Sequence, residues 1–260
     1  MIYLGYRTPS VADLTLKEKI ALAVELEMYS VELGPSDVKT MENVMELKDL
    51  SAESGIIIKA LAAGAVPVCN PDLKNEGEAL VKGLVEKAKI LGVDSFLART
   101  MNPEPDAKQA DTWKHCSDFM RFICEVCQDN GIKFAFEADR GNFVNSLERT
   151  ERLMELVNHK NFYINYDPAN FYMSGSDPLK VIDRLKDYII SGHIKDGVYR
   201  TDKKSETKIG EGEVDYAAIF KKLNDENITV AMHLEHCKSA QVVIDGAKYI
   251  KKVLASLEGQ

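Results

Sequence analysis

The sequence predicts an α/β fold, a (β/α)8 or TIM barrel that forms a single domain over residues 1–260. Three observations support this fold. Short β-rich runs alternate eight times with longer segments of helical periodicity, and they begin on average about 32 residues apart, the size of one βαβ unit. Most runs are apolar almost throughout, as in a parallel sheet covered on both faces. A chain of 260 residues also has the usual size of this barrel.

Eight segments are expected to be strands because they are rich in β-branched, aromatic and other apolar residues. In chain order they are Ile2–Tyr6, Ser30–Leu33, Ile56–Leu61, Ser95–Arg99, Lys133–Glu137, Phe162–Asp167, Tyr188–Ile194 and Thr229–Glu235. An open doubly wound sheet usually has a G-x-G-x-x-G turn after its first strand. The chain has Gly-Tyr-Arg-Thr-Pro at that position, so the barrel is favoured.

The segments between the predicted strands contain the signals that begin and end helices. Thr15 and Glu18 have the spacing of a capping box, and Asp177 precedes a proline suited to the first helical position. Gly92 and Gly131 lie where helices are expected to end in a left-handed residue. No linker rich in proline, glycine or serine interrupts the alternation, which is why one domain is predicted.

Composition and charge exclude several classes of function. Hydrophobic residues make up 45% and charged residues 28%, which is typical of a globular domain and not of a disordered chain. The net charge of −8 argues against nucleic-acid binding, which depends on Lys and Arg. The chain has no apolar run near the roughly 18 residues of a membrane span and no signal-peptide pattern at its N-terminus. Five scattered cysteines indicate reduced thiols in a cytoplasmic protein.

Ionisable side chains end four consecutive predicted strands, from the fifth to the eighth. They are Glu137, Asp167, His193 and Glu235. Neighbouring barrel strands lie about 4.8 Å apart, so these side chains can converge at the C-terminal mouth, where barrel enzymes carry their sites. Each carboxylate alone could instead cap a helix or form a salt bridge. Three carboxylates together repel one another unless a cation is present, and this set suits Mn²⁺ or Mg²⁺, with Co²⁺ or Zn²⁺ as alternatives.

With these residues in place, the chain resembles the xylose-isomerase-like sugar isomerase/epimerase superfamily along essentially its whole length. The stretches that carry the resemblance are Phe136-Glu137, Asp167–Asn170, His193–Asp196, Ile209–Glu213 and His233–His236. The resemblance implies that the four strand-end residues bind one divalent metal ion. It also implies that Glu137 and Glu235 act as the acid/base pair, and that the protein is a homodimer or homotetramer. Free-ketohexose epimerases of the superfamily tend to have a histidine where this chain has Asn170, which disfavours a ketohexose 3-epimerase.

These residue types suit proton transfer next to a carbonyl group. We expect the substrate to be a sugar or polyol that contains a keto group, that is, a ketose or keto-polyol. The protein would isomerise or epimerise it through an enediolate that the metal ion stabilises. Carboxylates on both sides of the substrate would give epimerisation, and one carboxylate shuttling on a single side would give isomerisation. Loss of a hydroxyl β to the carbanion would instead make the protein a dehydratase of the inosose or dehydroshikimate type. A non-catalytic binding module is the third interpretation.

Five further residues are predicted to bind the substrate: Glu32, Asn170, Lys195, Arg200 and His233. Lys195 shares the inward parity of His193 along its strand, and His233 shares that of Glu235. Other roles are open, because Glu32 can pair with Arg7 and His233 can orient a metal ligand. The connection over residues 197–213 is the longest in the chain and is expected to be a lid, a binding loop or a solvated surface loop.

Overall fold

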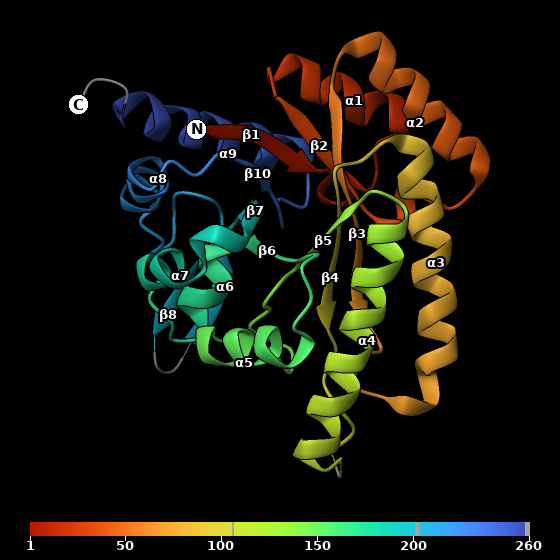
Figure 1. Ribbon diagram of the computed structural model, residues 1–260. Helices are drawn as coiled ribbons and strands as arrows, with labels where there is room; N and C mark the ends of the chain where they lie inside the picture. Colours follow the sequence, from red (N-terminus) through yellow and green to blue (C-terminus); the bar gives the residue numbers. More distant parts are fainter. Residues whose placement is uncertain (106, 201–202, 258–260) are drawn as a thin grey trace.

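The structure, a computed structural model, describes residues 1–105, 107–200 and 203–257. Eight parallel strands close into a barrel in the order β1-β10-β7-β6-β5-β4-β3-β2. They are β1 (Ile2–Arg7), β2 (Ser30–Leu33), β3 (Ile57–Val66), β4 (Ser95–Thr100), β5 (Lys133–Phe136), β6 (Phe162–Tyr166), β7 (Ile189–Ile194) and β10 (Val230–Leu234). The predicted (β/α)8 barrel is therefore confirmed, and Figure 1 shows the helices arranged around its outside.

Helices connect each strand to the next and cover the outer face of the barrel (Figure 1). They are α1 (Leu16–Glu25), α2 (Met41–Ser54), α3 (Lys74–Leu91), α4 (Gln109–Asp129), α5 (Leu147–Val157), α6 (Pro168–Met173), α7 (Pro178–Leu185), α8 (Tyr216–Asp225) and α9 (Ala240–Leu257). Short 3₁₀ turns cover Thr8–Val11, Pro35–Val38, Pro71–Leu73 and Lys186–Tyr188. Thr15 and Glu18 form the predicted capping box of α1, and Gly92 and Gly131 adopt the predicted left-handed conformation.

A short antiparallel hairpin follows β7, where the sequence predicts one long loop. Its strands are β8 (Asp196–Arg200) and β9 (Lys203–Thr207), so the loop prediction is wrong for this part of residues 197–213. The rest of the connection folds onto Asp196, whose carboxylate accepts hydrogen bonds from the amides of Gly210, Gly212 and Val214. A Cβ at Gly212 would lie 2.0 Å from Asp196 Oδ1, which is why this close approach requires glycine.

Two hydrophobic layers hold the barrel together. The larger one lies between strands and helices and includes the fully buried rings of Phe96, Phe134 and Phe136. The smaller one lies apart from it and consists of Ala60, Ala62, Leu97 and Ala135, with Ile190 packed against them. Among the described residues, every helix is too short or too polar to cross a lipid bilayer.

Candidate active site at the barrel mouth

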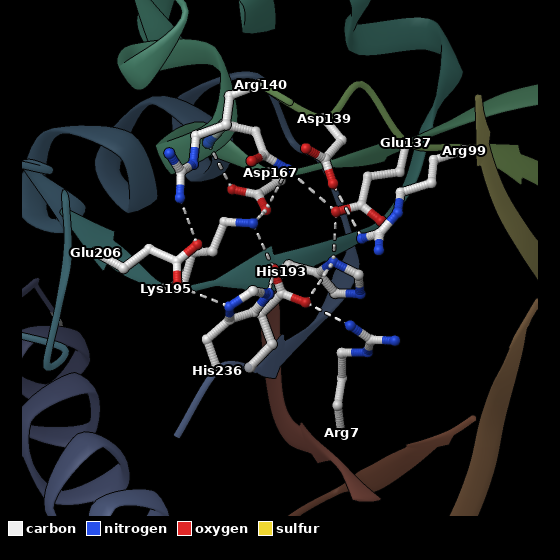
Figure 2. Close-up of polar contacts among 12 residues, drawn as sticks. Arg7, Arg99, Glu137, Asp139, Arg140, Asp167, His193, Lys195, Glu206 and His236 are labelled. Atoms are coloured by element: carbon white, nitrogen blue, oxygen red, sulfur yellow. Dashed lines mark hydrogen bonds and ion pairs between the residues drawn. The ribbon is translucent and has the colours of Figure 1, made fainter. Parts of the chain in front are cut away.

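The four predicted metal ligands lie together at the C-terminal ends of four neighbouring strands. Glu137 follows β5, Asp167 follows β6, His193 lies in β7 and Glu235 follows β10. One ligand atom from each residue lies within 4.8 Å of the others, and all four residues are buried. His193 Nδ1 lies 3.2 Å from Glu137 Oε1 and 3.5 Å from Glu235 Oε2. The convergence expected from the sequence is therefore present, and Figure 2 shows Glu137, Asp167 and His193 of this set.

Two cationic side chains reach into this cluster. Lys195 Nζ lies 2.9 Å from Asp167 Oδ2 and 2.7 Å from Glu235 Oε1, and its side chain is 3% exposed. Arg7 Nη1 donates to Glu235 Oε2 at 2.5 Å. Figure 2 shows both side chains directed at the carboxylates from different sides. The cluster is thus a set of buried acids with positive charge at its edges.

The pKa values show how strongly these acids interact. Burial raises the pKa of Asp167 from 3.8 to about 7, and Glu235 and Glu137 add to the shift while Lys195 opposes it. Burial also acts to raise the pKa of Glu235, but Lys195, His193 and Arg7 outweigh it and hold that pKa well below its usual value. One carboxylate therefore remains poorly stabilised as an anion. A divalent cation in the cluster would relieve this excess negative charge, so the residues present fit a metal ion.

Glu32 lies behind His193 and not in the space between the ligands. His193 Nε2 lies 2.9 Å from Glu32 Oε2, and Arg7 Nε lies 2.6 Å from Glu32 Oε1. Burial acts to raise the pKa of Glu32, but His193 and Arg7 outweigh it and lower the pKa to about 2. A carboxylate that accepts from one ring nitrogen orients the other nitrogen of a metal-binding histidine. Glu32 is therefore placed to direct His193 Nδ1 toward Glu137 and Glu235.

Asn170 joins two of the acids to the first turn of α6. Asp167 is the N-cap of this helix and accepts from the Asn170 amide at 2.9 Å. The Asn170 side-chain amide donates to Asp167 Oδ2 at 2.9 Å and to Glu137 Oε1 at 3.2 Å. Its Oδ1 atom is buried and accepts no hydrogen bond from the described residues. Asn170 therefore orients two predicted ligands and has an acceptor left for a substrate hydroxyl.

His233 is fully buried below the mouth of the barrel. Its Nε2 lies 3.0 Å from Ser30 Oγ, and its Nδ1 lies 3.8 Å from Glu32 Oε2. Burial lowers the pKa of His233 to about 4, so the imidazole is neutral near pH 7. A Cβ at Gly5 would lie 2.5 Å from this ring, which is why β1 has a glycine there. The ring therefore packs beside Gly5 and Ser30, and its Nδ1 makes no hydrogen bond with the described residues.

A second group of ion pairs surrounds the mouth. Arg99 pairs with Asp139 at 3.0 Å. Glu206, on β9, lies 2.8 Å from Arg140 after β5 and 2.9 Å from His236 after β10, so it links loops from two sides of the barrel (Figure 2). Arg200 ends β8 in the same hairpin, and its side chain lies outside the described part of the structure.

The pairing of Arg7 with Glu32 that the sequence offers is present in the structure. The contact of Arg7 with Glu235 is not among the predictions, although the place of Arg7 at the end of the first predicted strand is a signal for it. The contact of Arg140 with Glu206 is not predicted either. Arg140 and Glu206 come from a loop and from the hairpin that the sequence did not predict, so no spacing rule could pair them.

Comparison with known proteins assigns the fold to a family. A family model described as a xylose isomerase-like TIM barrel matches residues 20–254. The chain belongs to the xylose isomerase-like TIM barrel family. The resemblance found in the sequence is thereby confirmed.

Proteins with different names are similar to this chain. An inosose dehydratase of Clostridium perfringens is 23% identical over 250 residues, a match that covers 84% of this chain and 82% of that protein. The crystal structure of a D-tagatose 3-epimerase-like protein superposes with a TM-score of 0.86 at 17% identity, covering 99% of this chain and 98% of that one. The IOLI protein, solved with a bound zinc atom, superposes with a TM-score of 0.79 at 21% identity, and the match covers 98% of this chain and 97% of that one. Both reactions predicted from the sequence therefore fit the family.

Proposed function

We propose that this protein is a divalent-metal-dependent isomerase or epimerase that acts on a ketose or keto-polyol. The observation that carries the proposal is the convergence of Glu137, Asp167, His193 and Glu235, whose ligand atoms lie within 4.8 Å of one another at the barrel mouth. A structural neighbour named as epimerase-like supports this type of substrate. Buried acids of this kind at the C-terminal face of a barrel are typical of a catalytic site.

The four residues are the proposed ligands of one ion, Mn²⁺ or Mg²⁺, with Co²⁺ or Zn²⁺ as alternatives. Three carboxylates and one imidazole favour a moderately hard cation. The zinc atom in the IOLI structure shows that a related barrel binds a divalent metal. Such an ion supplies Lewis-acid polarisation of a carbonyl oxygen and stabilises the negative charge that develops on it.

Glu137 and Glu235 are the proposed acid and base. They come from β5 and β10, the two ends of a four-strand arc in which β6 and β7 lie between them. A substrate bound within this arc would have one carboxylate toward each side. One would remove the proton next to the carbonyl, and the other would return a proton from the opposite side. This arrangement favours epimerisation over a shuttle along one face.

Three residues remain proposed substrate contacts: Asn170, Lys195 and Arg200. Asn170 has a buried acceptor without a partner among the described residues, and Lys195 lies against two proposed ligands. Glu32 is instead assigned to the support of His193, because it is fully buried and contacts the His193 ring. His233 is assigned to the packing of the barrel interior, because it is fully buried beside Ser30.

Dehydration is the second candidate, and the sequence relatives favour it. The C. perfringens inosose dehydratase matches 84% of this chain. Both reactions begin with removal of the proton next to the carbonyl, so the same base serves either one. The products differ, because dehydration also expels a hydroxyl group β to the carbanion.

A panel of ketoses, keto-polyols and inososes tests the proposal by NMR in D₂O with Mn²⁺ present. We expect deuterium to enter at the carbon next to the carbonyl, with a stereoisomer or constitutional isomer as product. A product that has lost water would identify the dehydratase. Chain treated with EDTA is the control and should exchange no deuterium. Exchange at the same rate without metal would contradict the proposed function.

A further inference from the structure

Lys195 stands out because its ammonium group occupies the acid cluster itself. It bridges Asp167 and Glu235, which end β6 and β10, the strands on either side of β7. Lys195 follows β7 directly and lies two residues after His193, so its side chain leaves the strand on the same face. Figure 2 shows it extended toward Asp167. Within the described residues it is the lysine that contacts two proposed metal ligands.

The backbone of Lys195 is fixed as firmly as its ammonium group. The Tyr216 hydroxyl lies 3.0 Å from the Lys195 amide and accepts its hydrogen bond. The same hydroxyl donates to the Lys195 carbonyl at 2.5 Å. Tyr216 begins α8 and is 1% exposed, so this anchor lies in the packed interior. The backbone of Lys195 is therefore held in the packed interior, and burial and the ion pairs with Asp167 and Glu235 confine its side chain.

The positive charge at this position has two consequences. It attracts Asp167 and Glu235, which would otherwise repel each other and Glu137 when no other cation is present. It also repels any divalent ion that enters the cluster, because like charges in a buried site are only weakly screened. A neutral side chain of similar length would remove both effects and leave the four ligands unchanged.

We propose that the Lys195 ammonium group holds Asp167 and Glu235 together while no metal ion is bound, and that its charge lowers the affinity of the site for divalent ions. Lys195 is in this respect a positioning residue. The inference rests on the proposed metal-dependent function. This role of Lys195 explains why a buried cluster of carboxylates contains the ammonium group of a lysine.

The test compares Lys195→Met with wild type and with Lys19→Met. Lys19 is a matched control because it is also buried and also pairs with a buried carboxylate, Lys19 Nζ lying 2.7 Å from Asp37 Oδ1. That pair contains none of the proposed ligands. MnCl₂ is titrated by calorimetry into each protein after dialysis against EDTA and then buffer, and the Tm of each metal-free protein is measured.

We expect Lys195→Met to bind Mn²⁺ about tenfold or more tightly than wild type, although its metal-free form has a lower Tm. Lys19→Met should also have a lower Tm than wild type, but its Kd for Mn²⁺ should stay within about threefold of the wild-type value. Lys195→Arg keeps the charge and should have a Kd near that of wild type. If Lys195→Met does not fold without metal, Lys195→Gln, which retains a hydrogen-bond donor, is the variant measured.

Two outcomes would overturn the inference. A Kd for the neutral Lys195 variants that is unchanged or weaker, with Mn²⁺ binding by wild type intact, would refute the role of Lys195 and leave the proposed function standing. Folded wild-type protein that binds no Mn²⁺ would refute both.

Discussion

Replacement of Asp167 by asparagine tests the electrostatic description of the site. Burial and the neighbouring carboxylates raise the pKa of Asp167 from 3.8 to about 7 in the folded protein. The same group titrates near 3.9 in an unfolded chain. Between these two values the folded protein binds more protons than the unfolded chain, so the free energy of unfolding falls as the pH rises from about 4 to about 7. A shift of roughly three pKa units, at 1.36 kcal/mol each, sets an upper bound of about 4 kcal/mol.

Asparagine keeps an oxygen that can accept from the Asn170 amide but does not ionise. We expect metal-free Asp167→Asn to gain stability relative to wild type as the pH rises from about 5 to about 8, by about 1–3 kcal/mol. The gain is below the bound because part of the change, between about pH 4 and pH 5, lies outside this range. The assay is urea unfolding, followed by circular dichroism in EDTA, for both proteins across this range.

The difference between the two proteins reports the Asp167 carboxyl together with its effect on the charged groups around it, Lys195, Glu235 and Glu137. A difference in unfolding free energy that does not change with pH would refute the reasoning. Mn²⁺ should reverse the order near pH 8, because an ion that binds only the folded wild type stabilises it by mass action.

The remaining predictions concern activity and metal affinity. Glu137→Gln and Glu235→Gln should each lower kcat by about a thousandfold or more while circular dichroism shows a folded barrel, and a loss of less than tenfold would contradict their acid/base roles. EDTA should abolish activity, and Mn²⁺ or Co²⁺ should restore it best; unchanged rates in EDTA would exclude a metal requirement. Glu32→Gln should weaken Mn²⁺ binding by about 10–100-fold in calorimetry, because His193 loses the carboxylate that orients it; an unchanged Kd would refute that role.

The alternation of strands and helices could be predicted because each βα unit has its own local signal. Ser30–Leu33 has the same bounds in the sequence prediction and in the structure, and most other strands differ by one residue at an end. The strand that begins at Ile57 is an exception and continues to Val66, beyond the predicted end at Leu61. Its last part reads Ala-Ala-Gly-Ala-Val, and the low β-propensity of alanine and glycine conceals the extension.

The hairpin of β8 and β9 could not be predicted for a related reason. Lys203–Thr207 is polar and has no apolar alternation, and the hairpin forms its own two-stranded sheet outside the barrel. The hairpin contributes to the mouth through the hydrogen bond that Arg140 donates to Glu206, and these two residues are 66 positions apart in the sequence. Such pairs depend on tertiary placement and have no signal in spacing.

The convergence of the four strand-end residues was predictable from strand adjacency, and the pairing of Glu32 with Arg7 was among the predictions, whereas the contact of Glu32 with His193 was not. Glu32 and Arg7 face each other because β1 and β2 pair in register at these residues. This register turns Glu32 toward the back of His193, and no property of the local sequence shows that direction. The same limit applies to His233, whose fully buried position depends on the space left by Gly5 in the adjacent strand.

Glu137, Asp167, His193 and Glu235 are proposed to hold one divalent ion. An anomalous difference map at the manganese absorption edge, from crystals grown with MnCl₂, would locate that ion. We expect one strong peak among these residues, about 2.0–2.3 Å from a carboxylate oxygen of each acid and from His193 Nδ1. A map with no peak there, or with the only peak at another place on the molecule, would contradict it.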